Sequence, residues 1–154
     1  MALGFVIAAT GLKAEARIAE RSERVKAVIG GGREDRLATL LQEGLTESTR
    51  GLISFGIAGG LRPGLKPGTI IVGTSVLHSS GRIYPADARW SDRLFEALPN
   101  AESGPVTGSS TIIANRDEKH AIYLKSGAFA ADMESHVVAQ QLEGHPGPVV
   151  ASTD

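Results

Sequence analysis

The stretch Ile53-Ser-Phe-Gly-Ile-Ala-Gly-Gly-Leu-Arg-Pro-Gly-Leu-Lys-Pro-Gly-Thr-Ile-Ile-Val72 places a glycine-rich turn directly after one apolar run and begins a second run soon afterwards. Its core, Gly56-Ile-Ala-Gly-Gly60, is either a bare connection between strands or a backbone cradle, because glycines let N–H groups approach an anion or a sugar. It is not a Walker loop, since Gly-Lys-Ser/Thr is missing, and not a Rossmann fingerprint, since no helix follows. Taken alone, the turn leaves both interpretations open.

The composition indicates one globular domain, residues 1–154, with 42% hydrophobic residues. A formal net charge of −1, with basic and acidic residues well mixed, provides no field to attract nucleic acid or an anionic membrane. The chain has no cysteine, which excludes disulfides and cysteine-based metal or redox chemistry. Its first apolar run, residues 3–9, is too short for a membrane span. We therefore expect a cytoplasmic protein that binds a small ligand.

Short apolar runs alternate with amphipathic segments, a pattern typical of a layered α/β domain. The expected strands are residues 4–9, 25–29, 52–55, 69–76, 104–109 (with Ile112 and Ile113) and 128–131. The expected helices are residues 12–22, 33–43, 90–98, 117–125 and 133–142. An apolar pair, Val149 and Val150, then begins a last strand shortly before the sequence stops. Such a strand is normally covered by a helix, so we expect either that another chain covers it or that the fold is incomplete.

A carboxylate falls on the apolar side of the first expected helix. At about 100° per residue, Glu15 lies inside the arc bounded by Ile18 and Ala16. A buried carboxylate costs free energy unless it is paired or hydrogen-bonded. If Glu15 is buried, it is therefore either a structural partner or a functional group. The third possibility is that Glu15, near the edge of the apolar arc, is simply exposed to solvent.

A second carboxylate, Glu134, lies where a strand of small residues passes into the last expected helix. The simplest interpretation is that Asp132 is the N-cap and that Glu134 favours the first turn through the helix dipole. That interpretation does not explain why the Asp132-Met-Glu134 string occurs together with Glu15 and the glycine turn. His136 has no second metal-type residue at a suitable spacing, so we expect a structural histidine and no metal site.

Together, three segments resemble the nucleoside phosphorylase superfamily, which includes the methylthioadenosine/S-adenosylhomocysteine nucleosidases. They are Val6-Ile-Ala-Ala-Thr-Gly-Leu-Lys-Ala-Glu15, Gly56-Ile-Ala-Gly-Gly-Leu61 with Lys66-Pro-Gly-Thr-Ile-Ile-Val72, and Ala131-Asp-Met-Glu-Ser135. The strings Ser54–Leu61 and Asp132–Ala139 look closest to the hopanoid-associated phosphorylases. The resemblance implies a three-layer α/β/α sandwich around a mixed central sheet, with the last helix missing. It also implies an adenine nucleoside as substrate, of adenosylhopane type in the closest branch, and no cofactor, with phosphate as a possible co-substrate.

The resemblance also assigns roles to individual residues. Glu15 corresponds to the acid near the attacking water or phosphate, and Glu134 to the glutamate that binds the ribose hydroxyls. Met133 would pack against the sugar, and Ser110–Ile113 would lie along the purine, with Thr111 in place of an aromatic residue common in the nucleosidases. The predicted substrate-binding residues are Gly56, Ile57, Ala58, Gly59, Ile112, Met133 and Glu134, and the predicted catalytic residues are Glu15 and Glu134.

Two features depart from the family pattern. Relatives protonate the leaving base with an aspartate in a Ser-Asp motif, whereas this sequence ends at Ser152-Thr-Asp154. Asp154 either replaces that acid or the acid is absent, and we expect this C-terminally truncated chain to be weakly active or inactive. Many hexameric relatives hold phosphate with an arginine just before the turn, where Ser54 stands here. Its loss favours water as the nucleophile, or a phosphate site built from other groups.

Three hypotheses remain at this point. The first is an enzyme that releases adenine from a nucleoside, and the second is a non-catalytic purine- or nucleoside-binding domain that has lost its general acid. The third is a general α/β protein that binds a phosphate-containing cofactor. In each case the partner is a small molecule, and a homo-oligomer, most simply a dimer, is expected because the family builds its sites near subunit interfaces.

Overall fold

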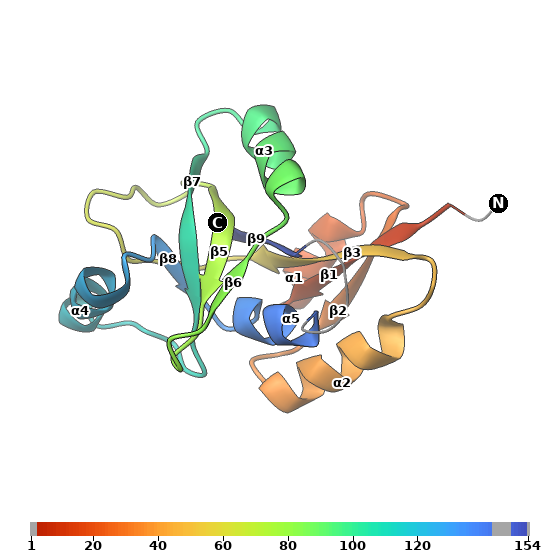
Figure 1. The fold of residues 1–154 in the computed structure, drawn as a ribbon, viewed down its shortest axis with the longest axis horizontal. Coiled ribbons are helices and arrows are strands. Elements are labelled where there is room, and N and C mark those ends of the chain that lie inside the picture. Colours follow the sequence, from red (N-terminus) through yellow and green to blue (C-terminus); the bar gives the residue numbers. More distant parts are fainter. Residues whose placement is uncertain (1–2, 143–148, 154) are drawn as a thin grey trace.

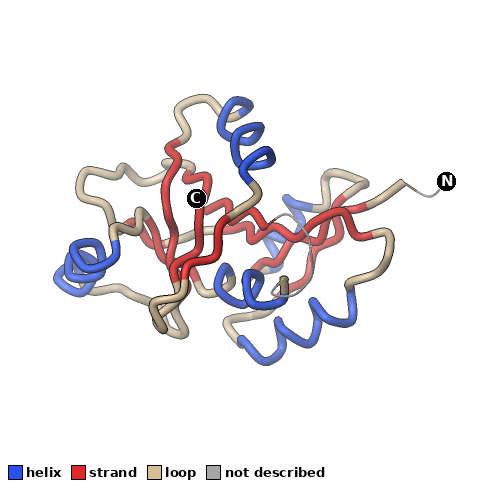
Figure 2. The backbone as a smooth tube through the Cα atoms, in the orientation of Figure 1, coloured by secondary structure: helices blue, strands red, loops and turns tan. Residues whose placement is uncertain are grey.

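A computed structural model describes residues 3–142 and 149–153 (Figure 1). Helices and strands alternate along most of the chain, as the tube in Figure 2 shows. The helices are α1 (Lys13–Ala19), α2 (Glu34–Gly44), α3 (Ala88–Ala97), α4 (Arg116–Ser126) and α5 (Ser135–Gln141). The strands are β1 (Phe5–Thr10), β2 (Val25–Ile29), β3 (Thr49–Gly56), β4 (Gly59–Gly60), β5 (Ile71–Leu77), β6 (Ile83–Pro85), β7 (Glu102–Gly108), β8 (Ala130–Asp132) and β9 (Val149–Thr153). The expected α/β fold is confirmed.

The strands form one mixed sheet in the order β2-β1-β3-β9-β5-β7-β8-β4, with β6 paired to β5. Strands β1, β2, β3 and β9 are mutually parallel, and β5, β7 and β8 form a second parallel group. The two groups meet where β9 pairs antiparallel with β5. The direction of the sheet therefore reverses near its middle.

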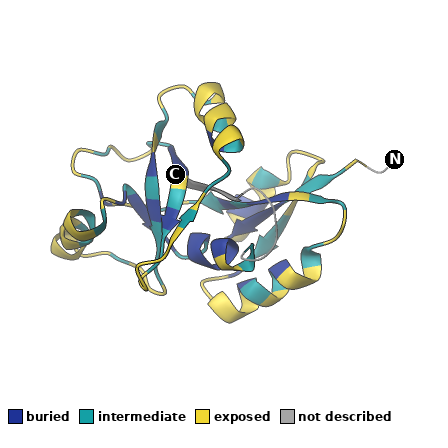
Figure 3. Ribbon diagram, in the orientation of Figure 1, coloured by how far each residue is buried: buried dark blue, intermediate teal, exposed yellow. Residues whose placement is uncertain are grey.

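The core follows from the burial pattern of the strands and two of the helices. Strand β1 is buried at every residue from Ile7 to Thr10, as expected for a parallel strand covered on both faces. One apolar cluster joins it to β3, α2 and α5 through Ile7, Ala9, Leu37, Leu41, Leu52, Val137 and Val138. Helix α5 also reaches the other strand group, because Ala139 packs in the cluster of β5, β7 and β8. Figure 3 shows α5 almost entirely buried, whereas α3 and α4 are largely exposed. Helix α5, which follows β8, therefore packs against both groups of strands.

The structure corrects several predicted elements. Strands β4 and β6 were not expected, and Ile112 and Ile113 lie outside β7. Helix α5 begins at Ser135 rather than Met133, so Glu134 occupies the N-cap position that we expected for Asp132. The last strand is confirmed, but it lies inside the sheet between β3 and β5. Asp154 lies outside the described residues.

Within residues 3–142 and 149–153, no helix is long and apolar enough to cross a membrane. Over the same ranges, no group of three or more histidine, aspartate or glutamate side chains is placed to hold a metal ion.

Candidate active site

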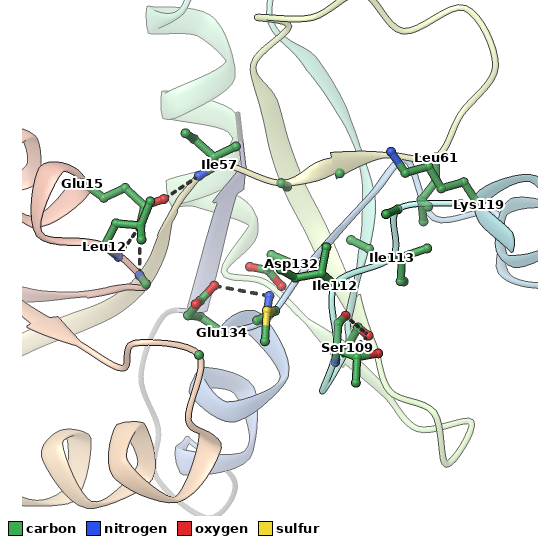
Figure 4. Close-up of a pocket in the computed structure, with 18 of the residues that line it drawn as sticks. Leu12, Glu15, Ile57, Leu61, Ser109, Ile112, Ile113, Lys119, Asp132 and Glu134 are labelled. Atoms are coloured by element: carbon green, nitrogen blue, oxygen red, sulfur yellow. Dashed lines mark hydrogen bonds between the residues drawn. The ribbon is translucent and has the colours of Figure 1, made fainter. Parts of the chain in front are cut away.

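A cavity of about 730 Å³ lies where several strand ends converge (Figure 4). Its wall comes from the segments that follow β1, β2, β3, β7 and β8. Ligand sites in open α/β sheets lie outside the carboxyl ends of strands, where loops of different strands meet. The sequence-predicted residues Glu15, Ile57, Ala58, Gly59, Ile112, Met133 and Glu134 all line this cavity. Gly56, at the end of β3, directly precedes the lining residue Ile57 in the sequence.

Glu15 is held by the backbone of two different strand ends. Its Oε2 accepts hydrogen bonds from the N–H groups of Gly11 and Leu12, at 2.8 and 2.9 Å. Its Oε1 accepts a third from the N–H of Ile57, at 3.0 Å. The residue is only 8% exposed. A carboxylate has about four acceptor positions, so one on Oε1 remains for a group in the cavity.

Two glycines allow the carboxylates to come this close to the backbone. A Cβ atom on Gly56 would lie 2.7 Å from Oε1 of Glu15. A Cβ atom on Gly11 would lie 2.6 Å from Oε1 of Glu134 and 3.6 Å from Oε2 of Glu15. Both carboxylates therefore border the same point beside Gly11.

Asp132 is a buried acid in the wall of the cavity. Its Oδ2 accepts a hydrogen bond from the Ser54 hydroxyl at 3.1 Å, and its Oδ1 accepts one from the Ser135 hydroxyl. The backbone N–H of Ser135 donates to both oxygens at 3.2 Å. Burial raises the pKa of Asp132, although these hydrogen bonds oppose the shift. Asp132 thus ties β3 to the start of α5, although it is not the N-cap.

Glu134 has a strongly shifted pKa. Burial, then the neighbouring charge of Asp132 and lastly that of Glu15, raise the pKa of Glu134 to about 7. The backbone N–H of Met133, which donates to its Oε2 at 3.3 Å, only partly opposes the shift. The ionised form of such a carboxyl group would be stabilised by a positive charge or by hydroxyl donors in the cavity. Perturbed acids of this kind concentrate at functional sites.

The raised pKa predicts a pH-dependent stability difference between the wild type and Glu134→Gln. The folded protein holds the Glu134 proton up to pH about 7, whereas the unfolded chain releases it near 4.5. The associated stability is fully present below pH 4.5 and is lost as the pH rises through 7. We expect Glu134→Gln to have the higher Tm at pH 8 and no advantage at pH 4.5. Thermal unfolding of both proteins across this range measures the difference, and a constant gap would contradict the assigned pKa shift.

The two arginines near the glycine turn in the sequence lie outside the cavity. Arg62 pairs with Glu102, and its guanidinium lies 4.4 Å from the centre of the Phe129 ring. Arg50 packs against Gly4, where a Cβ atom would lie 2.2 Å from the arginine Nε. Neither guanidinium is among the groups that line the cavity.

His136 contacts α2 and β7 and lies outside this cavity. It is buried on α5, and its Nε2 lies 2.7 Å from Oε1 of Glu34. A Cβ atom on Gly108 would lie 2.1 Å from its Nδ1, so the imidazole fills the space beside β7. It does not line the cavity that contains Glu15 and Glu134.

Several lining residues were not predicted from the sequence. They are Gly11, Leu12, Gly31, Gly32, Leu61, Ser109, Ala114, Lys119, Ala131 and Asp132. Thr111 and Ile113 also line the cavity and belong to the stretch expected along the purine. Gly31 and Gly32 form a turn after β2 that the sequence indicates by its consecutive glycines. The inward direction of Lys119 could have been predicted from the sequence. The residue shares a helix face with Ile122 and Tyr123, three and four positions further along.

The chain is an α/β protein with a cavity at the strand ends that three acidic residues, Glu15, Asp132 and Glu134, help to line. Residues 29–145 match the family model described as the phosphorylase superfamily, and the chain belongs to that superfamily. No curated protein sequence matches it.

Solved structures share the fold. A 5′-methylthioadenosine/S-adenosylhomocysteine nucleosidase from Neisseria meningitidis has a TM-score of 0.83 and 18% identity, covering 97% of this chain and 84% of the nucleosidase. The Helicobacter pylori nucleosidase gives 0.84 and 13%, with coverages of 100% and 85%. The S. pneumoniae nucleosidase gives 0.80 and 16%, with coverages of 96% and 83%. At these identities the likeness establishes the fold alone.

Proposed function

We propose that the protein cleaves the N-glycosidic bond of an adenine nucleoside and releases adenine. The observation that carries this proposal is the convergence of Glu15 and Glu134 on one point beside Gly11. Cleavage of such a bond passes through a sugar with cationic character, and fixed negative charges stabilise it as it develops. Each carboxylate comes from a different strand end, so the site exists only in the folded chain.

In this proposal the two carboxylates have different roles. Glu134 accepts hydrogen bonds from the ribose hydroxyls, and Met133 packs against the sugar. Glu15 uses its remaining acceptor position to orient the nucleophile beside the Ile57 backbone. Ionised Glu134 is the active form, so kcat/KM should rise with pH up to about 7 and then level off.

We propose water as the nucleophile. A phosphate dianion would need cationic or N–H donors beside Glu15, but Arg62 is engaged by Glu102 and Arg50 packs against Gly4. The Ser54 hydroxyl donates to Asp132. The N–H of Ile57, a natural anion donor, already donates to Glu15. The negative charge of a phosphate placed between the two carboxylates would be repelled by both.

The substituent on the 5′ carbon is proposed to be apolar, of adenosylhopane type. The motif resemblance to the hopanoid-associated branch supports this choice. So does an apolar rim near Glu15, where the cavity-lining side chains of Leu12 and Ile57 are 55% and 70% exposed. Apolar side chains this exposed at a pocket mouth are suited to a hydrophobic ligand group. Relatives of the same fold have been solved with methylthio-immucillin-A and with butyl-thio-DADMe-immucillin-A.

Product analysis tests this proposal. The protein is incubated with adenosine, methylthioadenosine and a 5′-alkyl adenosine, each with and without phosphate, and both products are identified by chromatography. We expect adenine and a free sugar in the absence of phosphate, fastest with the alkyl compound. A sugar 1-phosphate would show phosphorolysis instead, and adenine binding without any release would indicate a non-catalytic binding domain.

A further inference from the structure

The cavity has opposite charges at its two ends. Among the described side chains that line it, Lys119 is the only basic one, whereas Glu15, Asp132 and Glu134 are acidic. In Figure 4, Lys119 lies beside Leu61 and Ile113, at the opposite end from Glu15. The acidic end suits the sugar, as proposed above. The other end, with Leu61, Ile112 and Ile113, is apolar and suits a flat heterocyclic base.

Lys119 is directed inward by its helix. Arg116, Asp117, Glu118 and His120 on α4 are exposed, but Lys119 is half-buried on the face that also carries Ile122 and Tyr123. Its Cε would lie 3.8 Å from a Cβ atom placed on Gly59, so the side chain crosses from α4 to β4. In the part of the chain that the structure describes, no ion pair occupies its ammonium group. A bound ligand with a hydrogen-bond acceptor would provide a partner for this ammonium group.

The carbonyl oxygen of Ile113 borders the same place. It would also lie 3.8 Å from a Cβ atom on Gly59, as near to that point as the Cε of Lys119. The Lys119 side chain, which ends in a strong donor, and the Ile113 carbonyl, an acceptor, therefore both border Gly59 at the apolar end. The edge of an adenine offers the complementary pair, a ring nitrogen that accepts and an amino group that donates.

We propose that Lys119 is a catalytic residue that donates a hydrogen bond to a ring nitrogen of the base and stabilises its departure. This inference rests on the proposed function. When the C1′–N bond breaks, its electron pair remains on the base while a water oxygen bonds to C1′. The proton that the water loses passes through solvent to the base. Lys119 keeps its own proton and acts through its charge, which opposes the negative charge that develops on the base.

The charge arrangement matches the reaction as a whole. Negative groups surround the sugar, which becomes positive, and a positive group faces the base, which becomes negative. A phosphate-binding role for Lys119 is less suitable, because the nucleophile is oriented at Glu15 and Ile57, at the far end of the cavity (Figure 4).

Two substrates with different leaving groups test the role of Lys119. Adenosine has a poor leaving group, whereas p-nitrophenyl riboside has one that needs no stabilisation. We expect Lys119→Met to lower kcat/KM for adenosine by about 10²-fold and to leave that for the p-nitrophenyl compound nearly unchanged. Lys125→Met is the matched control, because Lys125 is exposed on the same helix and lines a different cavity. Equal losses for both substrates, no loss for either, or a rise in the phosphate KM alone would overturn the inference.

A binding measurement separates this inference from the proposed function. If the wild type releases no base, the proposed function fails, but titration calorimetry with free adenine still tests the Lys119 contact. We expect Lys119→Met to weaken adenine binding by about tenfold or more, as for loss of a hydrogen bond from a charged donor. Equal affinity for adenine in the wild type and the variant would overturn the contact.

Discussion

Glu134→Gln should lower kcat/KM for adenosine by about 10²- to 10³-fold, the loss expected when a charge-stabilising group is removed from a transition state. The amide keeps the size of the carboxylate and can still accept from a ribose hydroxyl, but it carries no negative charge. The cationic sugar therefore loses more stabilisation than the bound nucleoside does. Steady-state kinetics should show the loss mainly in kcat, with a smaller change in KM.

The control for this prediction is Glu43→Gln, an exposed glutamate on α2 outside the cavity. It should leave kcat/KM unchanged. An active Glu134→Gln variant would contradict the role assigned to the carboxylate. The predicted Tm advantage of the same variant at pH 8 separates loss of charge from loss of folding, because a misfolded variant would be less stable at every pH.

Glu15→Gln should lower kcat/KM by a similar factor of about 10² and should also reduce stability, unlike Glu134→Gln. The Glu15 carboxylate accepts from Gly11 and Leu12 through one oxygen and from Ile57 through the other. A glutamine has only one oxygen, so its NH₂ group must face an N–H donor. Leaving a buried donor unsatisfied costs about 1–3 kcal/mol. Denaturant unfolding and kinetics on the same sample measure both effects.

Glu20→Gln is the matched control, because its Oε1 also accepts from a backbone N–H, that of Ala27 at 3.0 Å, but at an exposed position. Water can replace that interaction, so we expect little change in stability or activity. If Glu15→Gln were as harmless as Glu20→Gln, the carboxylate would not be the bridge between the ends of β1 and β3.

Local patterns predicted most of the helices and strands, because each depends on neighbours in sequence. Strand β2 matches its predicted range, and the apolar face of α2 is buried at Leu37 and Leu41. Strand β4 could not be predicted in this way. Its two glycines have no strand propensity and are extended only because they pair with Ala130 and Ala131, some 70 residues further along the chain.

The sequence placed Glu15 on the apolar side of a helix, but its burial in the structure has a different physical reason. The helix arc indicated an apolar face, yet Ile18 and Leu12 are 50% and 55% exposed. Glu15 is buried because three backbone N–H groups surround it, one of them from the end of β3. That contact spans 42 positions and has no signature in a local pattern.

The convergence of Glu15, Glu134 and Lys119 also depends on topology. Their parent segments follow β1, β8 and β7, which the order of strands in the sheet brings to one cavity. From the sequence, Glu134 was equally compatible with simple helix initiation. In the structure, Asp132 rather than Glu134 accepts from the first N–H of α5, although Glu134 occupies the N-cap position. The pKa of Glu134 is raised first by burial and then by the two neighbouring acids, Asp132 and Glu15.

Adenine release in a single turnover, with the protein in excess over adenosine at pH 8, tests the central claim most directly. The wild type should convert the bound nucleoside to adenine and free ribose without added phosphate, and Glu134→Gln should do so about 10²-fold or more slowly. Adenosine that stays intact on a folded, saturated wild-type protein would contradict the proposed glycosidic cleavage. Equal release by the wild type and the variant would contradict the carboxylate mechanism.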